Sequence, residues 1–163
     1  MLKRKHYKVL RENNYRCINP KIICSEYLEE PGKTELTDYK FYCFGGVPKY
    51  FMVSYGEYSH NVRNHKFDMN WNSIDHLFKE NVAINPDVIE RPQNFDRMVE
   101  IATKLSAPFP HVRVDMYNLS DRIVFGEMTF YSAGGFVRVN SEQLDKEIGS
   151  WIRLEEYSKY MIK

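Results

Sequence analysis

Apolar and polar positions alternate most regularly between His111 and Gly135, and this pattern predicts two β-strands joined by a short turn. In the first strand three apolar residues share one face: Val112, Val114 and Met116. Asp115 lies on the opposite face, because successive side chains of a strand point to opposite sides. In the second strand Glu127 faces away from the corresponding set, which is Val124, Gly126, Met128 and Phe130.

The number of residues in the turn decides whether the two apolar faces coincide, because a slip of one residue turns every side chain to the other face. An odd number places Asp115 and Glu127 on the same side of the sheet. We therefore expect a loop over Asn118 to Arg122. That register pairs Asp115 with Phe125 and makes Glu127 a diagonal neighbour, roughly 7–8 Å away at the backbone.

Two carboxylates at this spacing permit two interpretations. They can share one Mg²⁺, whose oxygen ligands lie at about 2.0–2.1 Å. Alternatively, Glu127 pairs across the sheet with Arg113, since oppositely charged cross-strand neighbours stabilise a sheet. The spacing by itself favours the ion pair, and both interpretations stay open.

Helical periodicity is clearest from Asn94 to Ser106, where Asn94 is a good N-cap. The apolar stripe of this helix consists of Phe95, Met98, Val99, Ile101, Ala102 and Leu105. A second docking helix is expected over residues 141–163, capped by Ser141, and a basic helix with a solvated face over residues 1–14. We predict a single α+β domain in which residues 15–140 form an antiparallel sheet with flanking helices.

The segment from Thr37 to Tyr55 predicts a hairpin that turns at Gly45-Gly46. Lys40 lies on its first strand among aromatic residues, and must reach water or an anion because a buried unpaired ammonium is costly. A further strand is expected over residues 20–30. Residues 56–72 are expected to form a long irregular loop, and such loops are often functional. Residues 73–92 are expected to be loop with one short helical turn.

Charge and composition argue against nucleic-acid binding and against a membrane span, and favour a cytoplasmic protein. The formal net charge of +1 gives no overall field that would attract nucleic acid. No apolar run approaches the roughly 18 residues of a membrane span. The three cysteines form no C-x-x-C pair, which favours reduced thiols in a cytoplasmic protein, two of them buried in strands.

The stretches VRVDMYN and RIVFGEMTFYSAGG resemble the end of the ATP-grasp domain in the TupA-like family. The stretches NPKIICSEYLEE and LTDYKFYCFGGVPKYFMV resemble the part that precedes it, so the resemblance runs from about Tyr15 to Gly135. ATP-grasp enzymes hold ATP between two α+β subdomains and activate a carboxylate as an acyl phosphate, which a nucleophile then attacks. The family is associated with cell-surface polysaccharide and teichuronopeptide synthesis, and its members are often labelled glycosyltransferases.

This resemblance implies a site for ATP and Mg²⁺ on the central hairpin. Asp115 and Glu127 would hold the metal on the phosphates. Thr129 stands where many ATP-grasp domains place an asparagine ligand, and its hydroxyl is a weaker ligand. Lys40 would contact a phosphate as a catalytic cation, with Asp38 beside it in the nucleotide site; the alternative for Lys40 is a solvent-facing position on an edge strand.

The resemblance also implies contacts outside the hairpin. The adenine-side hinge would consist of Glu26, Tyr27, Leu28 and Glu29, which sequence alone would read as an ordinary strand end. Arg63, as a second catalytic cation, and His65 would face phosphate or an acidic acceptor from their loop. The alternative for His65 is a plain surface position, because one histidine specifies little.

Family members carry an upstream half with a lysine-bearing strand and a glycine-rich loop over the phosphates. No glycine occurs here between Met1 and Pro31. We therefore expect this chain to resemble the C-terminal part of such an enzyme, either completed by a partner chain that carries the missing half or inactive. Three hypotheses follow: a ligase half, a non-catalytic partner-binding domain, and a glycosyltransferase.

Overall fold

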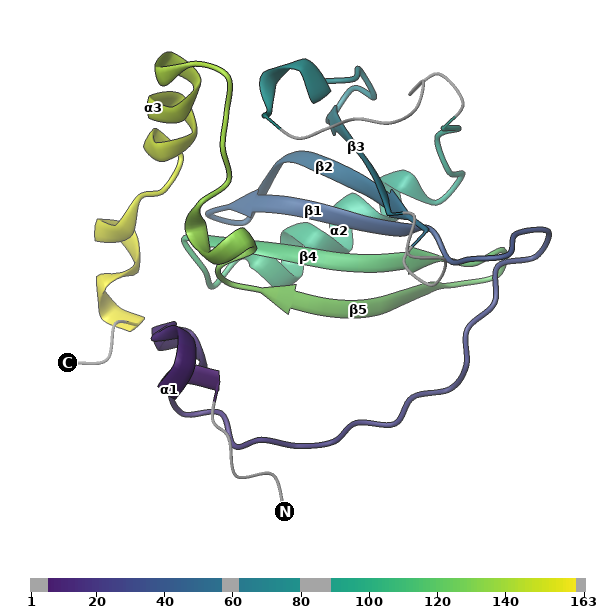
Figure 1. Cartoon of the computed structure of the whole chain (residues 1–163), viewed down its shortest axis with the longest axis horizontal. Coiled ribbons are helices and arrows are strands. Elements are labelled where there is room, and N and C mark those ends of the chain that lie inside the picture. Colours follow the sequence, from purple (N-terminus) through teal and green to yellow (C-terminus); the bar gives the residue numbers. More distant parts are fainter. Residues whose placement is uncertain (1–5, 57–61, 80–88, 161–163) are drawn as a thin grey trace.

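The computed structural model describes residues 6–56, 62–79 and 89–160. Within them lies a five-stranded antiparallel sheet with the order β3-β2-β1-β4-β5 (Figure 1). Its strands are β1 (Asp38–Phe44), β2 (Val47–Tyr55), β3 (Arg63–Asp68), β4 (His111–Asn118) and β5 (Ile123–Thr129). The α+β fold class and the antiparallel sheet with flanking helices are thereby confirmed.

Helices lie on both sides of this sheet. The α-helices are α1 (His6–Leu10), α2 (Phe95–Ser106) and α3 (Glu142–Ser150). The 3₁₀ helices are η1 (Asn13–Tyr15), η2 (Asp75–Leu77), η4 (Ser132–Gly135) and η5 (Leu154–Tyr160). Helix α2 packs against β1, β2 and β4, and Trp151 after α3 packs edge-on against Phe44 on the other face, 5.2 Å between ring centroids. Among the helices of the described residues, none is long and apolar enough to cross a membrane.

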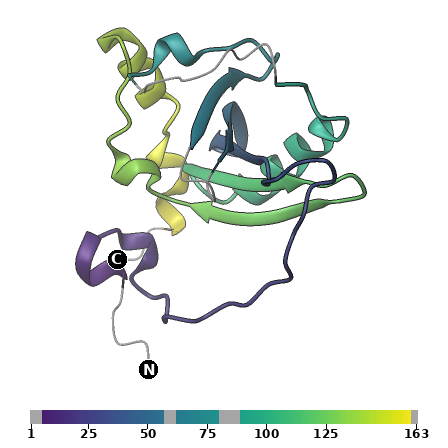
Figure 2. The same ribbon diagram turned by 45° about the vertical axis from the view of Figure 1, so that its right-hand side comes forward.

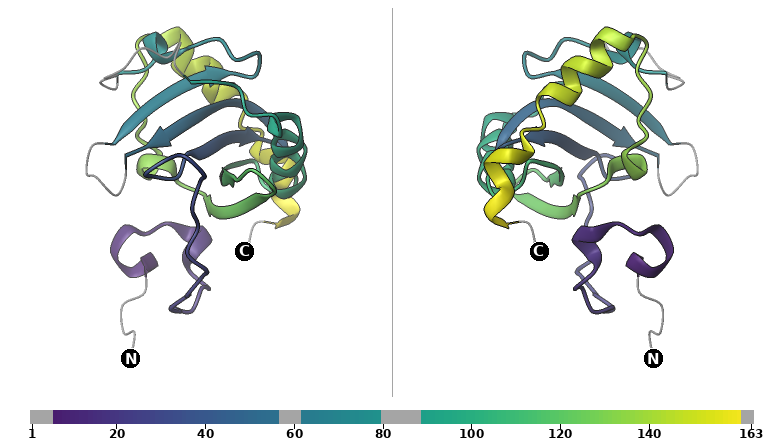
Figure 3. Two further views of the ribbon diagram at one scale, coloured as in Figure 1. Left: turned by 90° about the vertical axis from the view of Figure 1, so that its right-hand side faces the viewer. Right: turned by 90° about the vertical axis from the view of Figure 1, so that its left-hand side faces the viewer.

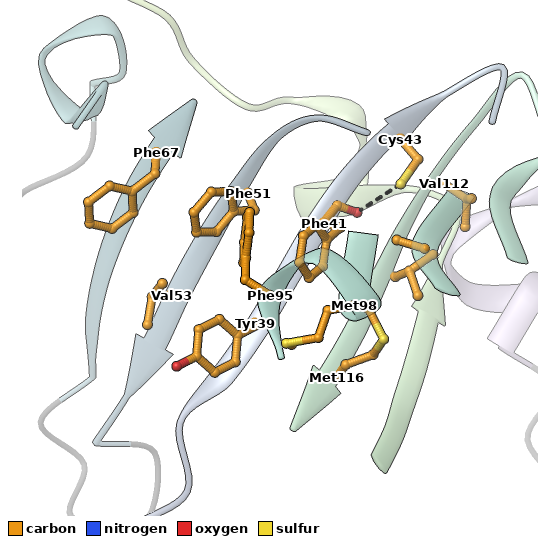
Figure 4. Packing of buried hydrophobic residues seen from close by; sticks show 12 residues of the cluster. Tyr39, Phe41, Cys43, Phe51, Val53, Phe67, Phe95, Met98, Val112 and Met116 are labelled. Carbon is orange, nitrogen blue, oxygen red and sulfur yellow. Dashed lines mark hydrogen bonds between the residues drawn. The ribbon is translucent and has the colours of Figure 1, made fainter. Parts of the chain in front are cut away.

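The main core lies between the sheet and α2. Phe51 is its centre and contacts the rings of Phe41, Phe67 and Phe95 at centroid separations of 5.6, 5.5 and 4.9 Å (Figure 4). The expected stripe of α2 forms the other wall, with Phe95, Met98 and Ala102 buried. Each fully buried Phe or Met contributes roughly 1.5–3 kcal/mol from burial alone, so this layer stabilises the packing of the sheet against α2.

The central hairpin places Asp115 and Glu127 on the same side of the sheet, as expected, but its loop and register differ from the prediction. Its loop has an even number of residues, because Asn118 pairs with Ile123 and the register near the loop matches Met116 with Phe125. The expected loop over 118–122 and the pairing of Asp115 with Phe125 are therefore wrong. A β-bulge between Val114 and Met116 adds one residue on β5, and beyond it Val114 pairs with Met128. The bulge restores the parity that the loop lacks.

A consequence of the bulge is that the apolar face of β5 switches along its length. Ile123 and Met128 both pack against the main core, although they were predicted to lie on opposite faces. Gly126 lies at the bulge, and a Cβ built there would approach the carbonyl oxygen of Asp115 to 3.1 Å. A glycine is therefore required here by the close approach of the two backbones.

One segment that was expected to be a strand is not one, and one segment that was expected to be a loop forms a strand. Residues 20–30 form no strand; they run past β5 as an extended stretch without sheet partners among the described residues (Figures 1 and 2). Arg63–Asp68, expected to be irregular loop, instead forms β3 along the edge of β2. Strand structure needs a partner edge, and the alternation of a segment does not report whether an edge is available. Residues 57–61 and 80–88 of the two expected loops lie outside the described residues.

The terminal helices are shorter than expected. The N-terminal helix ends at Leu10, and α1 and η1 project below the sheet (Figure 3). The C-terminal helix stops at Ser150 and continues as η5 rather than as one helix. Its predicted cap is confirmed, since Ser141 Oγ accepts from the Leu144 amide at 3.1 Å. Asn94 precedes α2 but makes no capping hydrogen bond, and its side chain donates to Asn118 Oδ1.

Candidate functional site

The face of the sheet opposite α2 carries a cluster of charged side chains. Alternation places Asp38 and Lys40 on this face of β1, and the register sets Lys40 directly opposite Asp115 of β4. The bulge brings Glu127 of β5 to the same side. The predicted proximity of Asp115 and Glu127 is thus observed, and both accept hydrogen bonds from one guanidinium, that of Arg113.

Lys40 joins two buried carboxylates. Its ammonium donates to Asp38 and to Asp115 Oδ2, the latter at 3.1 Å. All three residues are buried, and a buried charge is tolerated when it is paired and hydrogen-bonded in this way. The alternative of a solvent-facing edge lysine is therefore wrong. The structure gives Lys40 the role of a fixed internal counter-ion, and its predicted contact with a phosphate stays a prediction.

Arg113 contacts three residues around the cluster: Asp115, Glu127 and Ser132. Its Nε and Nη2 form a two-pronged contact with Asp115, at 2.8 Å to Oδ1 and 2.6 Å to Oδ2. The same Nη2 reaches Glu127 Oε1 at 3.0 Å, and Nη1 donates to Ser132 Oγ at 3.2 Å. The cross-strand ion pair between Arg113 and Glu127 is thereby confirmed. Parallel paired hydrogen bonds of this kind fix orientation as well as charge.

The neighbouring carboxylates stabilise the charged forms of both cations. Burial lowers the pKa of Lys40, but the carboxylates of Asp115 and Asp38 outweigh that effect and raise its pKa above the ordinary value. Burial likewise lowers the pKa of Arg113, and the hydrogen bonds and charge of Asp115 more than compensate, so that its pKa is raised. The cluster therefore combines the carboxylates of Asp38, Asp115 and Glu127 with two cations whose charged forms these neighbours favour.

Burial separates the two candidate metal ligands. The Asp115 side chain is 2% exposed, whereas that of Glu127 is 63% exposed. Thr129, next but one along β5, donates to Glu127 Oε1 at 3.1 Å. Asp115 is thus a rigid, preoriented carboxylate and Glu127 an accessible one, steadied by a hydroxyl beside it.

Arg63 and His65 do not join this cluster. Both belong to β3, where they share the α2 face of the sheet with Phe67. His65 is fully buried, and its Nδ1 lies 3.0 Å from Asp75 Oδ2. The expectation of a phosphate-facing loop is wrong for both residues, because this segment is a strand. The alternative of a surface histidine is wrong as well. Arg63 and His65 lie on the other face of the sheet from Lys40. Their roles in binding phosphate or an acceptor stay predictions.

The predicted hinge residues also lie outside the cluster. Glu26 pairs with Arg122, in the loop of the central hairpin, at 2.6 Å. Tyr27 is largely exposed, Leu28 is half-buried and Glu29 is exposed. No strand forms here to present backbone groups to a base, so the adenine contact stays a prediction.

A hollow of about 1200 Å³ adjoins the charged cluster. Its floor includes two pairs of rings, Tyr42 against Tyr50 and Phe44 against His111, each with a centroid separation of 4.4 Å. Ser132 lines the hollow and also accepts from Arg113. Burial lowers the pKa of His111 although Cys43 accepts a hydrogen bond from it, so its ring is neutral at pH 7. The hollow is therefore aromatic and touches the cluster at one residue.

The side chains of the cluster offer ligands of the kind that Mg²⁺ prefers, but too few to fill its coordination shell. The carboxylate and hydroxyl oxygens of Asp115, Glu127 and Thr129 are the hard ligands that Mg²⁺ prefers, and a cation already lies between the two carboxylates. Among the described residues no group of three or more Asp, Glu, His or Cys could enclose a metal. Any Mg²⁺ here would thus need water or phosphate oxygens to complete its shell, as is usual for this ion.

Sequence reasoning undervalued Arg113, which it treated only as an alternative partner for Glu127. The signal was present, because Arg113 and Asp115 are two positions apart and so share a strand face. The paired hydrogen bonds from Arg113 to Asp115 and its contact with Ser132 could be seen only in the folded structure.

An antiparallel α+β sheet with paired carboxylates and cations on one face is compatible with the ATP-grasp class. The chain belongs to the TupA-like ATPgrasp family, whose model matches residues 1–153. The match extends beyond the stretch from Tyr15 to Gly135 that carries the visible motifs. A search of curated proteins and a search of solved structures found no match.

Proposed function

We propose that this protein takes part in the ATP- and Mg²⁺-dependent activation and ligation of a carboxylate in cell-surface polysaccharide biosynthesis. One observation carries the proposal: Asp115 and Glu127 emerge on the same side of the sheet, joined by a single cation. Its cysteines are free thiols, which supports a cytoplasmic setting, although only Cys43 is buried in a strand and the expectation of two such residues is wrong. Membership of an ATP-grasp family supports the class of chemistry.

Bound Mg²⁺ would neutralise phosphate charge and orient the transferred phosphoryl group. Asp115 would supply a preoriented ligand, since Lys40 and Arg113 hold both of its oxygens in place. Glu127 would supply an adjustable ligand from the exposed edge of the cluster. A buried, oriented ligand beside an exposed one would leave one side of the site accessible to an incoming nucleotide.

The second substrate would enter through the hollow beside Ser132. The hollow is large enough for a small-molecule ligand, and its contact with the cluster through Arg113 would bring a bound acceptor close to the activated carboxylate. Its aromatic floor suits a ligand with an apolar or planar face.

Isothermal titration with Mg-ATP tests the proposed function. Glu127→Gln is expected to weaken binding about tenfold or more, equivalent to about 1.4 kcal/mol, because it removes one of two carboxylates. Glu100→Gln is the matched control: Glu100 is similarly exposed and ion-paired, but lies on α2 behind the sheet. Equal binding by wild type and Glu127→Gln would refute the assignment.

A second candidate function is non-catalytic partner binding, including binding of a chain that carries a glycine-rich half. The extended stretch before β1 supports it, because Ile22, Ile23 and Tyr27 are almost fully exposed. Exposed apolar side chains on an extended segment are typical of strands that pair with another chain.

This candidate predicts that the wild type binds a hydrophobic dye and self-associates as its concentration rises. Ile23→Lys is expected to lower both dye fluorescence and scattered light at least twofold. Val47→Lys is the matched control, since Val47 is an exposed apolar residue of β2. A monomer that binds no dye would argue against this function.

A further inference from the structure

Arg113 occupies the position that a metal ion bridging Asp115 and Glu127 would take. Its Nη2 lies 2.6 Å from Asp115 Oδ2 and 3.0 Å from Glu127 Oε1. A Mg²⁺ that bridged the same two oxygens would lie at about 2.0–2.1 Å from each. Nη2 and the ion therefore compete for one space.

Electrostatics make the competition stronger. The guanidinium remains protonated, and a dication next to it would be repelled by an interaction that grows as solvent is excluded. Lys40 already occupies another direction around Asp115 Oδ2. Displacement of Arg113 leaves Lys40 in place, so Asp115 keeps its orientation.

The structure also offers Arg113 a pivot. Its Nη1 donates to Ser132 Oγ at 3.2 Å, on the side that faces the hollow. Glu127 is largely exposed and can follow an incoming ion. Arg113 can thus swing toward Ser132 while the two carboxylates stay close together.

Resting on the proposed function, we propose that Arg113 is a resident counter-cation of the metal site. In the metal-free protein its guanidinium bridges Asp115 and Glu127, and a divalent cation binds between the carboxylates only by displacing it. Arg113 is then a positioning residue that keeps the site assembled when it is empty and weakens its affinity for metal.

Binding of Mn²⁺, followed by electron paramagnetic resonance without nucleotide, tests this inference. Arg113→Gln removes the competing charge and is expected to bind Mn²⁺ about tenfold or more tightly than the wild type. Arg113→Lys keeps a cation and is expected to stay within about threefold of the wild type. Arg97→Gln, on α2 and paired with Glu100, makes the same change of net charge away from the site and is expected to change affinity less than twofold.

A second measurement uses the wild type and so does not depend on the folding of a variant. The Arg113 Nε–H group donates to Asp115 Oδ1. As Mg²⁺ is added, its NMR resonance is expected to shift and its proton to exchange faster with water, with the same midpoint concentration as Mg²⁺ binding. An unchanged resonance at saturating Mg²⁺, or a folded Arg113→Gln that binds Mn²⁺ no more tightly than the wild type, would overturn the inference alone. Absence of metal binding by wild type and variants alike would overturn the proposed function with it.

Discussion

Replacing Asp115 with asparagine is expected to lower the free energy of unfolding by about 3–5 kcal/mol, the usual result of breaking a buried ion pair. Asp115 is almost completely buried and accepts from both Arg113 and Lys40. Asparagine has the same shape but no charge, and its NH₂ group would replace one of the two oxygens that accept hydrogen bonds from the cations. Urea unfolding followed by circular dichroism measures the loss.

Glu127→Gln is the matched control, because it deletes the same charge from the same cluster at an exposed position. Its loss should stay below about 1 kcal/mol, as for other exposed ion pairs. The raised pKa of Lys40 adds a pH signature: the ammonium stabilises the wild type at neutral pH, and its contribution is lost only as the pH rises through that raised pKa. Equal losses in the two variants would contradict the cluster described here.

Phe51→Ala is expected to cost about 3–5 kcal/mol, the range for large-to-small changes of buried aromatic residues. Phe51 is 0% exposed and lies between the sheet and α2, in contact with several rings (Figure 4). Its truncation removes the contacts of those rings at the point where α2 docks. The midpoint of urea unfolding should fall while the slope of the transition stays constant.

Phe125 provides the control for this prediction. It is an aromatic residue on β5 that is 52% exposed, so Phe125→Ala should cost less than about 1 kcal/mol, because surface substitutions are usually small. A Phe51→Ala variant as stable as Phe125→Ala would show that α2 does not depend on this core.

The charged cluster could be predicted from the sequence only in part. Alternation assigned Asp115 to the polar face of β4 without any knowledge of the fold. The proximity of Glu127 was predicted from a loop with an odd number of residues, whereas the loop in the protein has an even number. The bulge at Gly126 compensates for this difference in the protein, and a bulge leaves little trace in sequence beyond the glycine.

Buried polar residues mark a second limit. The segment that forms β3 contains His65 and Lys66, both buried, so it reads as loop when polarity is taken as exposure. The segment gains a strand partner in β2, and Asp75 contacts His65 Nδ1 and accepts a hydrogen bond from the backbone amide of Lys66. The ammonium of Lys66 lies over the ring of Phe78. Conversely, Ile22 and Ile23 read as a strand but have no sheet edge beside them in the described residues.

Sequence by itself determined the faces of β1 and β4, the docking stripe of α2 and the cap at Ser141, because each depends on residues within a turn or two of one another. It also gave the family, through motifs that survive as contiguous stretches. Tertiary structure decided which segments became strands, where the hairpin register shifts, and that Arg113 lies between Asp115 and Glu127. These depend on hydrogen-bond partners and packing surfaces distant in the chain, which no local pattern specifies.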